Sequence, residues 1–173
     1  MLLRVYGPIL WRSLCCTNAL VRAQATIIFF DAFPLQGNNN TANECDLLLQ
    51  KQFNYFYELL KDSDHRVRSA ASTGVCHILR EFWLVIPINT THQILKYIIC
   101  TLGKDSSCPS VRVSVVLGLN ELLDQPLSHT LLKSLLPQIA ETLHDKSVAV
   151  RIAFVGILNK VKSLIHTHSV YLM

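Results

Sequence analysis

Glycine and proline are scarce in this sequence, with 6 of each among 173 residues, and charged residues make up only 16% of it. Half of the residues are hydrophobic, which is far more than a disordered chain carries. Few helix breakers and many apolar residues favour a folded protein, and we expect disorder only in short loops. Charge of one sign is also lacking, because 16 basic residues face 12 acidic ones. The resulting net charge of +4 is too small to indicate nucleic-acid binding by itself.

Long apolar runs are missing as well. The longest uncharged stretch includes residues 82–93, and it contains Pro87 and several polar residues, so it falls short of the roughly 18 apolar residues that a membrane helix needs. The six cysteines show no Cys-x-x-Cys spacing. Cys76 and Cys100 lie inside apolar helical patterns, and we therefore expect buried free thiols in a reducing compartment.

Catalytic motifs are absent too. The sequence has no glycine-rich phosphate loop, no Gly-x-Ser-x-Gly, no His-Glu-x-x-His and no Cys/His zinc spacing. His166-x-His168 comes nearest to a metal pair, but no third ligand is close in sequence, and a solvated tail is the preferred interpretation. We therefore expect no enzyme, no catalytic or metal site, no cofactor and no small-molecule substrate.

One pattern is present several times: an acidic turn, then Val-Arg, then an apolar stripe at helical spacing. It is clearest from Asp62 to Arg68 and in the stripe that continues to Phe82. The Val-Arg pair recurs with Arg22, Arg112 and Arg151, and the four arginines are 46, 44 and 39 residues apart. Such a period, built on paired helices, is the signature of a HEAT or armadillo solenoid.

The fold class predicted is all-α, a right-handed superhelical stack of about four HEAT-type helix pairs. The repeats fall at about residues 3–33, 44–83, 90–123 and 129–163, with a divergent C-terminal tail at 164–173 and a polar surface loop at 36–41. Polar capping helices are not evident at either end, so we interpret the chain as part of a longer solenoid.

The arginines of the Val-Arg pairs admit two interpretations. In one, a row of arginines at one repeat position meets phosphate oxygens. In the preferred one, each arginine bonds the turn aspartate or carbonyl groups of its own or the adjacent repeat, because an aspartate lies five or six residues before the valine in three copies. The first copy has Cys16 at that position, so we expect its joint to be the least regular. The predicted structural ladder consists of Arg22, Arg68, Arg112, Arg151, Asp62, Asp105 and Asp145.

Other basic residues lie at or near the turns between paired helices. They could form a basic edge, although an ordinary solvated side chain is the preferred interpretation for any single one of them. The candidates for DNA contact are Lys61, Arg66, Lys104 and Lys146.

Several phrases resemble the HEAT-repeat G-subunit (non-SMC) family of condensin II. They fall at 8–14, 20–34, 67–69, 74–76, 124–129, 135–137 and 143–147, and the likeness covers about residues 6–163. The resemblance implies a non-catalytic scaffold subunit that binds the kleisin subunit and assists DNA engagement in mitotic chromosome condensation. It also implies an SMC ATPase pair and a second HEAT subunit as partners, a nuclear and chromosomal location, and no membrane association.

Three alternatives remain open at this point. A HEAT scaffold of another kind, such as a transport receptor or a phosphatase scaffold, would bind protein without DNA. A HEAT-fold enzyme acting on DNA bases would need a carboxylate beside an aromatic pocket, and neither Trp11 nor Trp83 has a convincing one in sequence. Arg4, Arg12 and Arg22, with no acid before Asp31, also fit a mitochondrial presequence, although the same stretch fits the first helix pair.

Overall fold

The computed structural model describes residues 2–36 and 41–170, with side chains placed for residues 6–36 and 41–165. The described residues form eight α-helices and three short 3-10 segments, and the all-α prediction is confirmed. The bounds are α1 Leu2–Leu14, α2 Ala19–Asp31, α3 Ala42–Leu60, α4 His65–Glu81, α5 Ile88–Cys100, η1 Leu102–Lys104, α6 Pro109–Leu122, η2 Pro126–Ser128, α7 His129–Leu135, η3 Leu136–His144 and α8 Val148–Val170.

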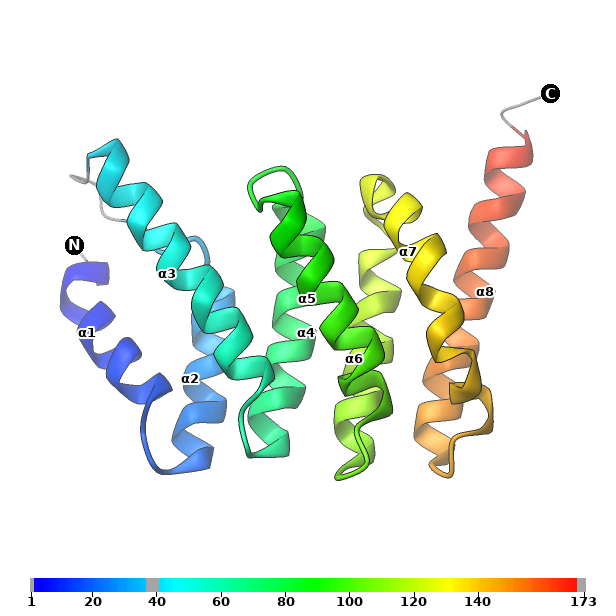
Figure 1. The fold of residues 1–173 in the computed structure, drawn as a ribbon, viewed down its shortest axis with the longest axis horizontal. Coiled ribbons are helices and arrows are strands. Elements are labelled where there is room, and N and C mark those ends of the chain that lie inside the picture. Colours follow the sequence, from blue (N-terminus) through cyan, green and yellow to red (C-terminus); the bar gives the residue numbers. More distant parts are fainter. Residues whose placement is uncertain (1, 37–40, 171–173) are drawn as a thin grey trace.

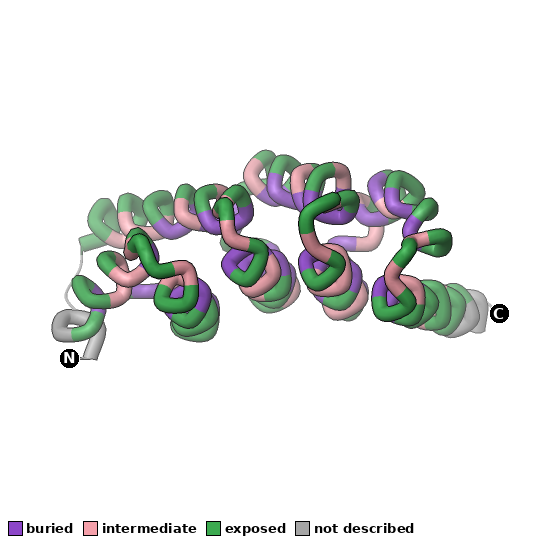
Figure 2. Tube along the Cα trace, turned by 90° about the horizontal axis from the view of Figure 1, so that it is seen from below, coloured by how far each residue is buried: buried purple, intermediate pink, exposed green. Residues whose placement is uncertain are grey.

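The helices pack as successive antiparallel pairs arranged side by side (Figure 1). Seen end-on, α2, α4, α6 and α8 form one row, and α3, α5 and α7 form the other (Figure 2). The most extensive contacts join α4 to α6, α2 to α4 and α6 to α8. Each second helix therefore packs on the second helices of its neighbours. The turns within the four pairs all lie along the lower edge of Figure 1, which we call the turn edge.

The repeated apolar stripes supply one continuous core. In α4, Val67, Ala71 and Val75 are fully buried, and in α6 so are Val115 and Leu119. These residues belong to a single cluster that runs from the first helix pair to the last. No helix pair in such a stack buries its stripe alone, because neighbouring pairs cover part of it.

The helix starts follow from short polar residues at the turns. Asp64 caps α4 by accepting a hydrogen bond from the backbone N–H of Arg66 at 2.9 Å, as its position before the helix predicts. Thr41 and Glu44 form a reciprocal capping box at the start of α3. Pro109 opens α6, where a missing N–H costs little. These caps fix where each turn ends.

The largest departure from the expected elements lies in the fourth pair. The fourth repeat, predicted at 129–163, implies one continuous first helix, but α7 ends at Leu135 and the chain continues as the tighter η3. Pro137 explains the change, because it has no N–H to donate and it restricts the residue before it. At the other end of the pair, α8 continues to Val170, past the expected repeat end at 163.

Three further expectations have different outcomes. Cys76 is buried as expected, whereas Cys100 is only half-buried, and its thiol donates to the side-chain amide oxygen Oε1 of Gln138 at 2.7 Å. Most of the expected polar loop, residues 37–40, and the side chains of His166 and His168 lie outside the described residues. Across the described ranges, no helix is long and apolar enough to cross a membrane.

Candidate functional site

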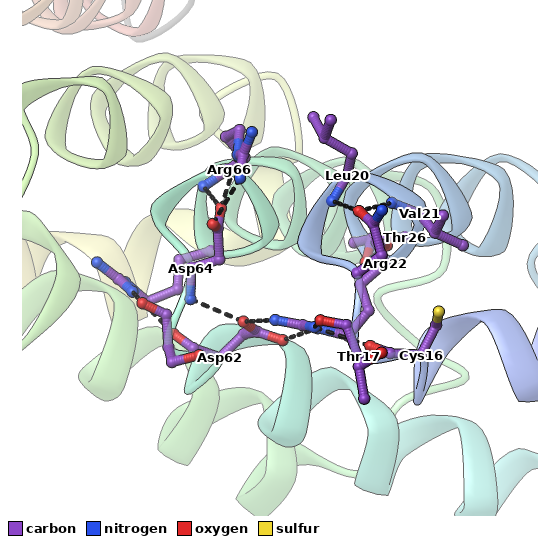
Figure 3. A network of polar contacts seen from close by, with 12 residues as sticks. Cys16, Thr17, Leu20, Val21, Arg22, Thr26, Asp62, Asp64 and Arg66 are labelled. Carbon is purple, nitrogen blue, oxygen red and sulfur yellow. Dashed lines mark hydrogen bonds and ion pairs between the residues drawn. The ribbon is translucent and has the colours of Figure 1, made fainter.

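The first joint between helix pairs is built around Arg22, in the first turn of α2 (Figure 3). Its Nε and Nη2 donate to the two carboxylate oxygens of Asp62, each at 2.8 Å. Its Nη1 donates to the backbone carbonyls of Cys16 and Thr17 at 2.8 and 2.9 Å. One planar guanidinium therefore binds its own turn and the turn of the following pair at once.

The next two joints repeat this arrangement. Arg112 donates from Nε and Nη2 to Asp145, at 2.7 and 2.8 Å, and from Nη1 to the carbonyl of Asp105 at 2.6 Å. Arg68 donates from Nε to Asp105 at 3.0 Å. Its Nη2 donates to the hydroxyl of Ser107 at 2.6 Å.

Which partner each arginine takes is thus settled by the geometry of the stack. The carbonyl acceptors belong to the arginine's own turn, and the carboxylate acceptor belongs to the following pair. Arg22, Arg68 and Arg112 keep only 14%, 11% and 14% of their side-chain surface exposed. Largely buried arginines that already bond carboxylate and carbonyl groups offer little to a phosphate group, which favours the structural interpretation of these three.

The expectation for the first joint is wrong. Cys16 stands where the other turns have an aspartate, but Arg22 uses the backbone carbonyl of Cys16 and not its side chain. The carboxylate that Arg22 binds comes from Asp62 in the second pair. The irregular position is at the other end. Arg151 donates from Nη1 to the carbonyls of Asp145 and Lys146, at 2.6 and 3.3 Å, and pairs with no carboxylate among the described side chains.

The ladder shifts the titration of its aspartates. Burial raises the pKa of Asp62, but the hydrogen bonds from Arg22 and from a backbone N–H outweigh it, and the pKa ends below its ordinary value. Burial also raises the pKa of Asp105, where the hydroxyl and N–H of Ser107 reverse the shift. The hydrogen bond between Arg22 and Asp62 also raises the pKa of Arg22. Both partners are therefore held in their charged forms.

Stability is expected to depend on this ladder as pH falls. The pKa of Asp145 is lowered chiefly by its hydrogen bonds from Arg112. An aspartate in the unfolded chain has a pKa of about 3.9. The stabilisation from the Asp145–Arg112 pair is therefore present above that pH and is lost as the pH falls through the lower pKa of the folded state. We expect the urea midpoint to fall between about pH 5 and about pH 2.5. Arg112→Gln should lessen that fall, because Asp145 then titrates closer to its unfolded value; an equal fall in both proteins would contradict the assignment.

The candidate DNA-contact residues all lie in or beside the turns that form the turn edge, and all four are exposed. Arg66 folds back on Asp64, with Nε and Nη2 at 2.9 and 2.8 Å from the carboxylate oxygens. The ammonium of Lys61 lies 5.7 Å from the ring centre of Tyr57. Lys104 lies 3.8 Å from Glu141, whose side chain is 89% exposed. Lys146 has no ion pair among the described residues.

The other singled-out side chains do not assemble a chemical site. His77 is exposed and lies 3.9 Å from Glu121, and Trp11 carries the ammonium of Lys51 at 4.2 Å above its ring. Burial raises the pKa of the Cys76 thiol to about 12, which keeps it protonated and unreactive at neutral pH. Within the part of the chain that the structure describes, no three His, Cys, Asp or Glu side chains gather as metal ligands.

A shallow groove lies across the exposed faces of α2, α4 and α6, with a volume of about 520 Å³. Small and polar side chains line much of it, including Ser69, Thr73, His77 and Glu121. The sequence pattern did not reveal this groove, because it is formed by three helices that are each about 40 residues apart.

Comparison with known proteins shows what this chain is similar to. Residues 1–37 match the family described as "Condensin II non structural maintenance of chromosomes subunit". Condensin-2 complex subunit G2 of Danio rerio is 44% identical over 94% of this chain, and that of Mus musculus is 44% identical over 95%. The subunit of Homo sapiens is 43% identical over 95% of the chain.

No solved structure matches the chain. The chain spans 14% of the length of each of these three relatives. Identity of this level over nearly the whole chain, together with the family match at residues 1–37, confirms the resemblance found in the sequence. The chain is therefore homologous, over almost all of its own length, to one segment of the condensin II non-SMC subunit G2.

Proposed function

We propose that this chain is a HEAT-type segment of a right-handed solenoid that serves condensin II as a non-catalytic scaffold. The observation that carries the proposal is the similarity to condensin-2 complex subunit G2 over 94% of the chain. The stacked helix pairs support it, because three arginine–aspartate joints give the stack a fixed repeat geometry. A rigid stack of this kind presents an extended surface, which suits binding better than catalysis.

The partners proposed are the kleisin subunit of condensin II and, through the complex, its SMC ATPase pair and second HEAT subunit, in the nucleus and on chromosomes. The groove across α2, α4 and α6 is the surface we assign to a protein partner, since it spans three helix pairs. Its lining of Ser69, Thr73 and Glu121 offers hydrogen-bond partners to an extended chain.

The test is binding of the purified chain to the condensin II kleisin. Thr73 is exposed, and its one side-chain hydrogen bond among the described residues is within its own helix, at 3.3 Å to the carbonyl of Ser69. Thr73→Lys places a long charged side chain in the groove and should abolish binding of the kleisin. The control is Thr130→Lys, at an exposed position on α7 outside the groove, which should leave binding intact. Failure of the unaltered chain to bind the kleisin would overturn the proposal.

DNA engagement is assigned to the turn edge. Counted up to and including their Val-Arg pairs, the four turns span 15–22, 61–68, 101–112 and 145–151. Together they hold eight basic and four acidic residues, which gives a net charge of +4, equal to that of the whole chain. The ladder neutralises Asp62, Asp105 and Asp145, while the lysines beside them stay exposed. An edge of this kind suits sequence-independent contacts with phosphate groups.

We predict that Lys61, Lys104 and Lys146, changed together to glutamine, weaken binding to a duplex of random sequence. The slope of log K against log salt should become shallower by about one for each lysine removed. The matched control changes Lys96, Lys133 and Lys162, which lie exposed away from the turns, and should keep the original slope. Equal losses in both variants would remove DNA contact from the turn edge, and absence of any DNA binding would favour a scaffold for proteins alone.

A further inference from the structure

The groove across α2, α4 and α6 has a charge opposite to that of the chain as a whole. The chain carries a net charge of +4. Among the described residues that line the groove, however, there are two carboxylates, Asp31 and Glu121, and no lysine or arginine. The remaining titratable side chain in the lining is His77. The groove is therefore an acidic surface on a basic protein.

Neither carboxylate is neutralised by a close ion pair. Asp31, the last residue of α2, is exposed and pairs with no basic side chain in the part of the chain that the structure describes. Glu121 is 43% exposed, and it lies 3.9 Å from His77 and 4.0 Å from Arg80. Arg80 is held more closely by Glu81, at 2.7 Å. Unlike the ladder aspartates, these two acids remain available to a basic partner.

Small side chains keep the groove open. Its lining includes Ser69, Ala70, Thr73 and Gly74 of α4 and Ser114 of α6. On the side of α2, Ile27 is 44% exposed and Phe30 lies beneath it with 4% exposed. The small residues let a polypeptide main chain approach the helices closely, and Ile27 offers an apolar contact beside the acids.

The two acids belong to a regular row. Asp31, His77 and Glu121 each stand nine residues after the ladder arginine of their helix, so the row crosses α2, α4 and α6, which lie side by side (Figure 2). The same position in α8 is Lys160, which is bonded to Asp124 at 2.7 Å. The acidic part of the row is therefore confined to the first three second helices.

The spacing of this row sets the spacing of a matching partner. Packed helices have axes about 9 Å apart. Three residues of an extended chain span about 10 Å. Residues that face Asp31 and Glu121, two helices apart, are thus about six positions apart in an extended segment. An even separation also places both side chains on the same face of that segment.

We infer that the kleisin segment bound in this groove is extended and basic, with two lysine or arginine residues about six positions apart that pair with Asp31 and Glu121. This assignment rests on the proposed function, in which the kleisin of condensin II occupies the groove. It also separates the two binding surfaces by charge, because an acidic groove repels the phosphate groups that suit the turn edge.

The first experiment measures binding of the purified kleisin to variants of the full chain. Asp31→Asn and Glu121→Gln each remove one charge with little change of shape. Each should weaken binding about threefold, and the two together about tenfold. Asp46→Asn removes an exposed carboxylate from α3, which lies in the other row of helices, and should leave the affinity unchanged. An unaltered urea midpoint shows that each variant is folded.

A second pair of variants separates charge from shape. Thr73→Glu and Thr73→Gln place side chains of nearly the same size at one exposed position in the groove. The kleisin should bind the Thr73→Glu variant about threefold more tightly than the Thr73→Gln variant, because the added carboxylate attracts a basic segment. Equal affinities, or weaker binding of Thr73→Glu, would contradict the inferred charge of the partner.

Double-mutant cycles test the spacing. Each lysine and arginine of the kleisin is changed to glutamine in turn, and each change is combined with Asp31→Asn or Glu121→Gln. Two basic positions about six apart should lose affinity non-additively, one with each acid. Kleisin binding that withstands loss of both acids, or basic positions that couple to neither, would overturn the inference and leave the proposed function standing. Failure of the unaltered chain to bind the kleisin would overturn both.

Discussion

Asp105→Ala is expected to lower the free energy of unfolding by about 3 kcal/mol. The carboxylate is 9% exposed and accepts hydrogen bonds from Arg68 and from the backbone N–H groups of Ser107 and Cys108. Its removal leaves the Arg68 guanidinium, itself only 11% exposed, without its counter-charge and takes away the bonds that order the turn before α6. Breaking a buried pair from one side is costly because the remaining charge stays desolvated.

Urea unfolding measured by circular dichroism checks this value. Asp46→Ala is the matched control, because Asp46 is an exposed carboxylate on α3, and it should change stability by less than about 0.5 kcal/mol. In an Arg68→Gln background the cost of Asp105→Ala should shrink, since no stranded guanidinium remains. If Asp105→Ala cost as little as Asp46→Ala, the ladder would contribute nothing to stability.

Gly74→Ala is expected to destabilise the chain by about 2 kcal/mol, although alanine is the better helix former. Gly74 lies in the middle of α4, and a Cβ there would overlap the ring and the Cβ of Phe30 in α2. Phe30 is 4% exposed and its ring contacts the rings of Phe29 and Phe56, so a shift of Phe30 that relieved the overlap would disturb these core contacts. The glycine is needed for the close approach of two second helices.

Gly156 provides the comparison within the same protein. A Cβ added there meets no atom within 4 Å, so Gly156→Ala should stabilise α8 by up to about 1 kcal/mol through helix propensity alone. Thermal unfolding of the two variants should therefore shift in opposite directions. In a Phe30→Ala background, Gly74→Ala should lose most of its cost, and a cost that persisted there would place the clash elsewhere.

The local features of this protein could be predicted from its sequence because they depend on neighbours a few residues apart. Helical spacing of apolar residues after Val67 and Val111 predicts which face of α4 and α6 is buried. A short acid such as Asp64 before a helix predicts its cap. Pro137 signals a break, although the pattern alone did not reveal that a 3-10 segment would replace the rest of the helix.

By itself, then, the sequence determined the all-α class, the helix pairs, their period and the residues from which the joints are made. Only the tertiary structure decided that Arg22 pairs with Asp62 of the next pair, that Gly74 meets Phe30, and that Arg151 is left without a carboxylate among the described residues. The reason is physical: helix formation and burial pattern repeat every few residues along one chain segment. The contacts of a joint instead depend on how two segments about 40 residues apart are superposed in space.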